Sequence, residues 1–191
     1  MASDRTGDMA TNGIDPIQFE VVRSALTQVA EEMAAALRRS AYSTNVKTRQ
    51  DFSCAFFDRD CRPISQAFSQ PVHLGSFVEL IPNSVKEYGA ENLGPGDMLV
   101  VNNPFGGGSH LNDVTVFGPV HHKGELVGYV ASLAHHVDVG GGAPASIGPF
   151  QEIYQEGIII PPVKLVQNDV INEEIFRLIL AQIRSKRVTT G

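Results

Sequence analysis

Two β-rich runs joined by a short turn constrain the fold of this chain more than any other feature of its sequence. The runs span residues 114–120 and 125–133, and the connection between them ends in Lys123-Gly124. Because glycine readily adopts the positive φ of a two-residue turn, this pattern predicts an antiparallel β-hairpin. The turn then fixes which residues of the two runs lie opposite each other.

Histidines and aspartates gather at the open end of this hairpin. Five of the six histidines lie between residues 101 and 146. The predicted hairpin should bring the segment that holds His110 and Asp113 to the segment that holds His135, His136 and Asp138. Convergent imidazoles and carboxylates are typical of a metal or acid/base site, and mixed ligands of this kind suit zinc or manganese. The alternative interpretation is a hydrogen-bonded network that joins two loops.

A regular hairpin would not put these side chains on one face of the sheet. Counting outward from the turn pairs Asn112 with His135. Strict alternation then places His110 and His135 on one face and Asp113 on the other. We therefore expect that the ladder ends before the site or that a β-bulge shifts the register by one residue. Pro119 cannot donate to a ladder, which favours an irregularity in that strand.

Glycine triplets lie beside both groups, at residues 106–108 and 140–142. Neither is followed by the Lys-Ser or Lys-Thr and helix of a phosphate loop, and neither matches a dinucleotide fingerprint. Glycine lets main chain approach a metal or substrate closely. We therefore expect the site to be lined by the backbone of Gly106, Gly107, Gly108, Gly140 and Gly141.

The rest of the pattern predicts an α+β fold. Asp15-Pro16 begins an amphipathic helix that continues to about Ser40. Further predicted elements are strands at 52–57, 98–101, 157–160 and 163–166, a helix at 74–88 interrupted by Pro82, and a helix at 172–186. We expect the long first helix to pack on a mainly antiparallel sheet containing the central hairpin, followed by the terminal helix. Residues 1–14 are predicted to be a disordered leader.

Composition excludes several classes of partner. The formal net charge is -6 and no basic cluster is visible, which argues against a nucleic-acid or anionic membrane surface. No apolar run approaches the roughly 20 residues of a membrane span, and the start has no signal-peptide core, so we expect a cytoplasmic protein. The spacing of Cys54 and Cys61 fits no zinc knuckle, and we expect reduced, structural thiols.

Two further residues have less certain roles from sequence alone. Asp51 stands at the start of the apolar run 52–57, where a carboxylate is either a turn cap or a site group. His73 lies in a polar stretch with little periodicity. We interpret His73 as a hydrogen-bonded structural histidine.

Three segments together resemble the hydantoinase B family. They read KTRQDFSC at 47–54, NPFGGGSHLND at 103–113 and AHHVDVGG at 134–141. The family includes the B subunits of ATP-dependent N-methylhydantoinases, the matching half of 5-oxoprolinase and the α subunits of acetone-type carboxylases. The resemblance extends from about Asp15 to the last residue, which makes residues 15–191 the N-terminal part of a hydantoinase B-like domain.

The resemblance implies a metal-dependent subunit of an ATP-dependent cyclic amidohydrolase that opens rings of the N-methylhydantoin or 5-oxoproline type. A hydantoinase A-type partner in a hetero-oligomer would use ATP to phosphorylate a carbonyl or enolate oxygen. In hydrolytic members, a water on the zinc or manganese ion would attack the phosphorylated amide carbon. At matching positions the metal ligands would be Asp51, His110, Asp113 and His135, with His136 and Asp138 orienting them.

Two other functions are compatible with the same resemblance. The chain could belong to the α-type subunit of an ATP-dependent ketone carboxylase, or it could be an inactive, metal-stabilised assembly fragment. Family members are usually several hundred residues long, so this chain would correspond to about the first third, as a fragment or a truncated product. We expect no ATP-dependent turnover by the chain alone.

Overall fold

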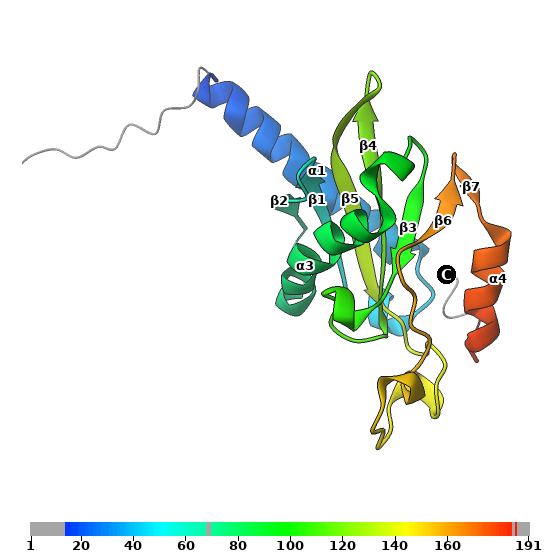
Figure 1. The fold of residues 1–191 in the computed structure, drawn as a ribbon. Helices are drawn as coiled ribbons and strands as arrows, with labels where there is room; N and C mark the ends of the chain where they lie inside the picture. Colours follow the sequence, from blue (N-terminus) through cyan, green and yellow to red (C-terminus); the bar gives the residue numbers. More distant parts are fainter. Residues whose placement is uncertain (1–13, 68–69, 185, 187–191) are drawn as a thin grey trace, which may run out of the picture.

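A seven-stranded antiparallel sheet forms the centre of the domain (Figure 1). The structure is a computed structural model and describes residues 14–67, 70–184 and 186, so the predicted leader lies outside it except for its last residue. The strand order is β2-β1-β5-β4-β3-β6-β7. The strands are β1 Phe52–Asp58, β2 Pro63–Gln66, β3 Met98–Val101, β4 Asp113–His122, β5 Glu125–His135, β6 Val163–Gln167 and β7 Val170–Ile171.

The helices confirm the predicted α+β class and the long first helix. They are α1 Pro16–Ser40, α2 Thr44–Lys47, α3 Pro71–Tyr88, α4 Glu173–Gln182 and the short 3-10 turns η1 Ala90–Asn92, η2 Pro104–Gly106, η3 Pro144–Ser146 and η4 Ile153–Gln155. The start of α1 is as predicted, because the Asp15 side chain accepts the N–H of Ile17 and Pro16 needs no donor at the first position.

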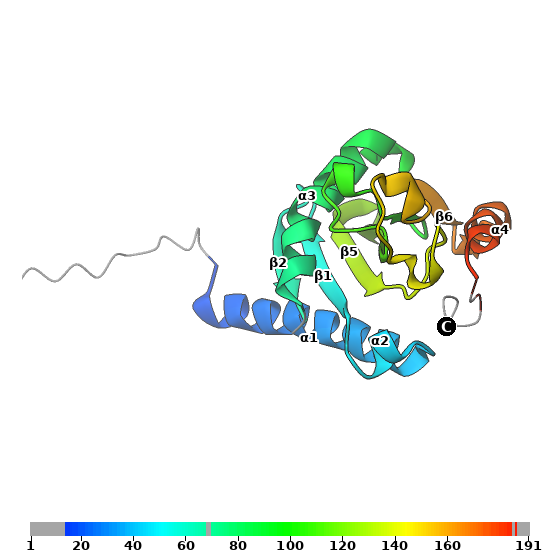
Figure 2. The same cartoon turned by 90° about the horizontal axis from the view of Figure 1, so that it is seen from below.

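The sheet separates two layers of helix (Figure 2). Alternate residues of a strand point to opposite faces, and β1 is buried on both. Phe57 joins the core beneath α3, whereas Phe52 and Cys54 join the smaller core beneath α1. Only Ala30 and Ala34 of α1 are buried, and its first half extends past the sheet (Figures 1 and 2).

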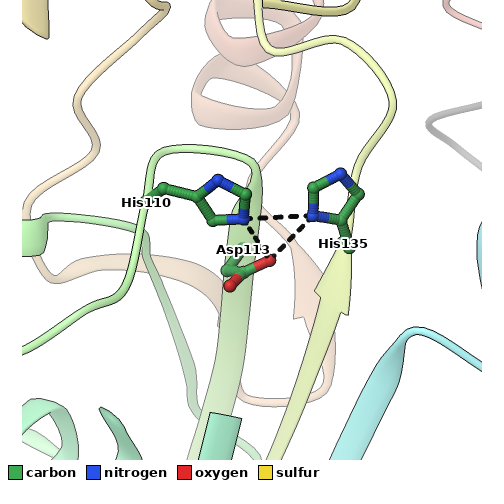
Figure 3. A group of neighbouring side chains, drawn as sticks. All are labelled: His110, Asp113 and His135. Atoms are coloured by element: carbon green, nitrogen blue, oxygen red, sulfur yellow. Dashed lines mark hydrogen bonds and ion pairs between the residues drawn. The ribbon is translucent and has the colours of Figure 1, made fainter. Parts of the chain in front are cut away.

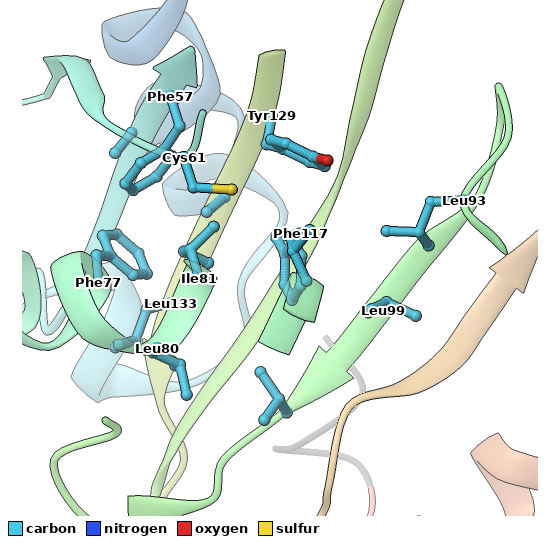
Figure 4. Close-up of a cluster of buried hydrophobic side chains, with 14 residues drawn as sticks. Phe57, Cys61, Phe77, Leu80, Ile81, Leu93, Leu99, Phe117, Tyr129 and Leu133 are labelled. Atoms are coloured by element: carbon cyan, nitrogen blue, oxygen red, sulfur yellow. The ribbon is translucent and has the colours of Figure 1, made fainter. Parts of the chain in front are cut away.

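The larger core lies between α3 and the sheet and fixes the position of α3 (Figure 4). Phe77, Leu80 and Ile81 of α3 are almost fully buried, as are Leu133 and Phe117 from the central strands. Fully burying such a side chain contributes about 1.5–3 kcal/mol. The first turn of α3 is therefore held firmly over one end of the sheet.

Three of the predicted elements differ from those in the structure. Pro82 does not interrupt α3, which begins three residues earlier than predicted, because the buried apolar face of the helix outweighs the missing proline N–H. Residues 157–160 form no strand; the side chain of Asn102 bonds to the backbone of Ile158 and Ile160 in place of a ladder. The helix α4 ends at Gln182 rather than residue 186.

Within the described part of the chain, no helix combines the length and apolar character needed to cross a membrane. The cytoplasmic location stays a prediction.

A buried ion pair ties the edge of the sheet together. Asp97, 5% exposed, accepts hydrogen bonds from Lys164 Nζ at 2.8 Å and from the N–H groups of Gly94 and Asn168. Burial by itself raises the pKa of Asp97, but these hydrogen bonds outweigh it and hold the pKa below its ordinary value. The carboxylate therefore links the start of β3 to β6 and to the turn that follows it.

We expect Asp97→Asn to lower the free energy of unfolding by about 2–4 kcal/mol at pH 7, because Lys164 loses its counter-ion in a site with little solvent. Urea unfolding measures this change. Since the folded-state pKa of Asp97 lies below the unfolded value of about 4, its stabilisation is complete above that pH and is lost as the pH falls through the folded-state pKa. The difference between the two proteins should therefore shrink on acidification.

The matched control is Asp60→Asn. Asp60 pairs with Arg62, and their side chains are 61% and 72% exposed, so its removal should change the free energy of unfolding by less than about 1 kcal/mol. Equal losses in the two variants would contradict the role assigned to Asp97.

Candidate metal site

A β-bulge in the central hairpin brings the predicted residues onto one face of the sheet. His121 pairs with Leu126, but Val120 pairs with Gly128, so Val127 is an extra residue on β5. Beyond this bulge the register is shifted by one, and Asp113 lies directly opposite His135. The expected β-bulge is therefore present, but its extra residue lies on β5 and not in the strand of Pro119, which pairs regularly with Tyr129.

His110, Asp113 and His135 converge at the open end of the hairpin (Figure 3). Asp113 Oδ1 lies 3.0 Å from His110 Nε2 and 3.0 Å from His135 Nδ1. The two ring nitrogens lie 3.1 Å apart. His110 reaches the strand from the preceding turn, which is closed by a hydrogen bond from the Asp113 N–H to the His110 carbonyl. We call these three residues the triad.

Protons alone do not satisfy the contacts of the triad. A carboxylate only accepts hydrogen bonds, and a neutral ring nitrogen presents either an N–H or a lone pair. If both facing nitrogens of His110 and His135 carried protons, the N–H groups would repel each other. If either nitrogen lacked its proton, a lone pair would face the carboxylate of Asp113. A cation at the common point would attract all three donor atoms.

Asp113 is the fixed member of the triad. It is 3% exposed, and its second oxygen accepts a hydrogen bond from Ser109 Oγ. Burial by itself raises the pKa of Asp113, but the hydrogen bonds from His110, His135 and Ser109 hold the pKa far below its ordinary value. The hydrogen bond to Asp113 in turn raises the pKa of His110. Asp113 is therefore ionised at neutral pH.

Asp51 lies next to the triad, but its carboxylate is not among the three donor groups that converge on one point. Its backbone carbonyl accepts the N–H of His135 at 3.0 Å, which joins the start of β1 to the end of β5. Its carboxylate Oδ1 lies 3.5 Å from His73 Nε2. Asp51 thus contacts the triad directly through its backbone, whereas its carboxylate is paired with His73.

His73 is the site residue whose position the sequence did not reveal. It belongs to the first turn of α3 and is 2% exposed. Its Nε2 lies 3.6 Å from Asp113 Oδ2, and its Nδ1 lies 3.0 Å from Ser53 Oγ. Burial lowers the pKa of His73. The side chain is hydrogen-bonded, as interpreted, but it also belongs to the site, and only the packing of α3 on the sheet brings it there.

The two remaining predicted residues hold the segment after β5. The backbone of His136 is bonded twice to Asn112, at 2.7 Å and 2.8 Å, and burial lowers the pKa of its ring to about 4. Asp138 accepts hydrogen bonds from the N–H groups of Gly140 and Arg184 and from the Arg184 guanidinium. The hydrogen bonds of Asp138 therefore lead away from the triad, toward the end of the described chain.

Gly107, Gly140 and Gly141 approach other backbone closely. A Cβ at Gly107, whose φ is +109°, would lie 2.7 Å from the N of Leu80 in α3. Gly140 and Gly141 also have positive φ and similarly approach the backbone of residues 182 and 155. These close approaches give the three glycines a packing role; that the glycine backbone also lines the site stays a prediction.

The substitution Gly107→Ala should lower the free energy of unfolding by more than about 2 kcal/mol, because the new Cβ meets α3 backbone and the left-handed φ strains an L side chain. Chemical unfolding measures the change. Gly106→Ala is the matched control, since an added Cβ there has no neighbour closer than 4.0 Å. A destabilised Gly106→Ala beside an unaffected Gly107→Ala would contradict this assignment.

A hollow of about 250 Å³ opens beside the triad. Its lining includes His110 and His135 together with Ile147, Phe150 and Glu156. The segment after β5 supplies the last three of these residues. A small molecule in this hollow would contact the two exposed edges of the triad.

Comparisons with known proteins agree with this architecture. The family model described as Hydantoinase B/oxoprolinase matches residues 15–191. An uncharacterised protein of Methanocaldococcus jannaschii is 45% identical over 93% of this chain, and 5-oxoprolinase 1 of Arabidopsis thaliana is 42% identical over 95%. The caprolactamase subunit beta of Pseudomonas jessenii is 35% identical over 94%.

Two solved structures share the fold. The crystal structure of the ATP-dependent caprolactamase from Pseudomonas jessenii has a TM-score of 0.84 and 34% identity over 93% of this chain. A nucleotide-free structure of acetone carboxylase has a TM-score of 0.83 at 20% identity, covers 92% of this chain and 23% of its own, and shows the fold alone.

The chain is much shorter than these proteins. It spans 32% of the Methanocaldococcus protein, 14% of 5-oxoprolinase 1 and 31% of the caprolactamase chain. Even so, the matched family region covers nearly all of its length and includes the triad, Asp51 and His73. The chain belongs to the hydantoinase B/oxoprolinase family.

Proposed function

We propose that this chain is the metal-binding part of a subunit of an ATP-dependent cyclic amide hydrolase. The observation that carries the proposal is the convergence of His110, Asp113 and His135 on one point at the end of the hairpin. The relatives named 5-oxoprolinase and caprolactamase support ring opening of a cyclic amide as the reaction class.

The donor set of the triad fits a divalent metal ion. Two imidazole nitrogens and a carboxylate oxygen lie 3.0–3.1 Å from one another. Neighbouring ligands have such separations around an ion with bonds of about 2.0–2.2 Å, and this mixture suits zinc or manganese better than calcium or magnesium. When bound, such an ion acts as a Lewis acid that polarises an oxygen atom and stabilises the negative charge developing on it.

The residues around the triad have distinct parts in the proposal. Asp113 holds its ionised carboxylate in a buried, fixed position. Asp51 is proposed as a further ligand, because its carboxylate is directed toward the same histidine as Asp113. His136 holds the end of β5 through its backbone bonds to Asn112 and so keeps His135 in register.

The hollow beside the triad suits a small cyclic amide. Its volume of about 250 Å³ lies just below the roughly 300–1,000 Å³ of sites for drug-sized ligands. Ile147 and Phe150 of its lining offer apolar surface to ring methylenes, and His110 and His135 of the triad belong to the same lining. The substrate amide would then lie with its carbonyl toward the triad.

ATP is assigned to a partner subunit of the hydantoinase A type. The sequence has no phosphate-binding loop, and the triplet at 106–108 is packed on α3. The word subunit in the name of the Pseudomonas jessenii relative supports a hetero-oligomer. Ketone carboxylation remains the second candidate, favoured only by a shared fold with acetone carboxylase.

We expect the purified chain to bind close to one equivalent of zinc or manganese, and His110→Ala to weaken that binding at least about 100-fold, because one of three converging donors is removed. Isothermal titration of metal-stripped protein and elemental analysis measure both quantities. His122→Ala is the matched control, since His122 is exposed at the hairpin turn. Metal binding that survives His110→Ala unchanged would exclude the ligand assignment.

For the activity, the gene should be expressed at its full length together with a hydantoinase A-type subunit. We expect ATP-dependent ring opening of 5-oxoproline, a hydantoin or caprolactam, detected as the ring-opened acid and ADP. Asp113→Asn should abolish the ring-opened product, because the carboxylate that faces both imidazoles is lost. The 191-residue chain without the partner should give no turnover.

Two results would refute the proposed reaction. One is ring opening that needs no ATP, and the other is full activity of Asp113→Asn. Incorporation of labelled bicarbonate into acetone under the same conditions, without amide hydrolysis, would favour the carboxylase.

A further inference from the structure

The buried side chain of His73 stands between two carboxylates. Its Nε2 lies 3.5 Å from Asp51 Oδ1 and 3.6 Å from Asp113 Oδ2, so one ring atom faces both acids. The other ring nitrogen, Nδ1, lies 3.0 Å from Ser53 Oγ. The ring comes from α3, whereas Ser53 and Asp113 belong to β1 and β4 of the sheet and Asp51 directly precedes β1.

The neighbours of His73 determine where its ring carries a proton. Carboxylates repel a lone pair, so the nitrogen that faces Asp51 and Asp113 carries the proton, and its Nε2–H attracts both acids electrostatically at 3.5 Å and 3.6 Å. The Nδ1 atom then has a lone pair, and the Ser53 hydroxyl donates to it. Ser53 belongs to β1 and Asp51 directly precedes that strand, and the side chains of both lie against the His73 ring.

We propose that His73 is a positioning residue that holds the carboxylate of Asp51 beside that of Asp113. The proposal rests on the proposed function, because it concerns how the metal site is assembled. Two carboxylates that share a largely buried site repel each other, and the shared Nε2–H donor offsets this repulsion. Without the donor, Asp51, whose side chain is 31% exposed, is free to turn toward solvent.

The firm packing of α3 explains why a histidine on this helix is suited to the task. His73 lies one turn before Phe77, which is 1% exposed in the core. The position of its ring is therefore set by the packing of α3 on the hydrophobic core. The influence of His73 on the site should pass through Asp51, which gives the proposal a specific test.

The test compares His73→Gln with His73→Leu in the 191-residue chain, by titration with Co²⁺. The glutamine amide can place an N–H donor near the position of Nε2, whereas leucine fills the space without a donor. We expect His73→Gln to bind Co²⁺ within about threefold of the unsubstituted chain, and His73→Leu to bind it about 10–100-fold more weakly. The visible absorption of bound Co²⁺, which reports its coordination, should change in His73→Leu only.

A double substitution separates positioning from a general loss of structure. If His73 acts through Asp51, then in an Asp51→Asn background the additional change His73→Leu should cost less than about threefold in Co²⁺ affinity. Thermal unfolding of metal-free samples checks that the variants remain folded. Should a leucine variant fail to fold, the comparison of His73→Gln with His73→Asn replaces it, because asparagine offers its donor at the Nδ1 position instead.

The outcomes are distinguishable from those that test the proposed function. Equal Co²⁺ affinity of His73→Leu and the unsubstituted chain would overturn the role of His73 and leave the triad intact. The role of His73 would also be overturned if the losses of Co²⁺ affinity from the two substitutions multiplied in the double variant, because His73 and Asp51 would then act independently. Failure of the unsubstituted chain to bind Co²⁺ at all would overturn both proposals.

Discussion

The pairing of Asp113 with His135 across the central hairpin is the constraint on which the site depends. Side chains directly opposite in an antiparallel pair share a face and lie about 4.5–5.5 Å apart at Cβ. The single extra residue, Val127, sets this register from the other end of the two strands. Without it, Asp113 would face α1 while His135 faced α3, and the two donors could not meet.

The same face of the sheet carries both the larger core and the site. Leu133 and Phe117 are buried beneath α3, and two residues further toward the strand ends this face presents His135, with Asp113 opposite. The apolar residues hold α3 in place, and α3 holds His73 over the acids. The polar residues of the site thus lie at the end of the apolar core, on α3, β4 and β5, whose positions the core fixes.

The local sequence pattern was sufficient to predict the hairpin, the start of α1 after Asp15 and the approach of His110 to His135. Each depends on residues close in sequence or joined by one turn. His73 could not be assigned in this way, because its approach to Ser53 requires α3 to dock on the sheet. The pairing of Asp138 with Arg184 could not be predicted either, since Arg184 lies 46 residues further along the chain. Tertiary packing, rather than propensity, decides both contacts.

The site has a buried side and a solvent-exposed side. Asp113 and His73 have side chains that are each 3% exposed and lie on the inner side, whereas His110 is 48% exposed on the outer side. A group that carries a fixed charge benefits from a rigid, desolvated setting, because its field is less screened there. A ligand must instead arrive from solvent, and the hollow opens toward His110 and His135. Asp113 and His73 therefore form the buried, fixed side of the site, and His110 and His135 face the hollow through which a ligand would enter.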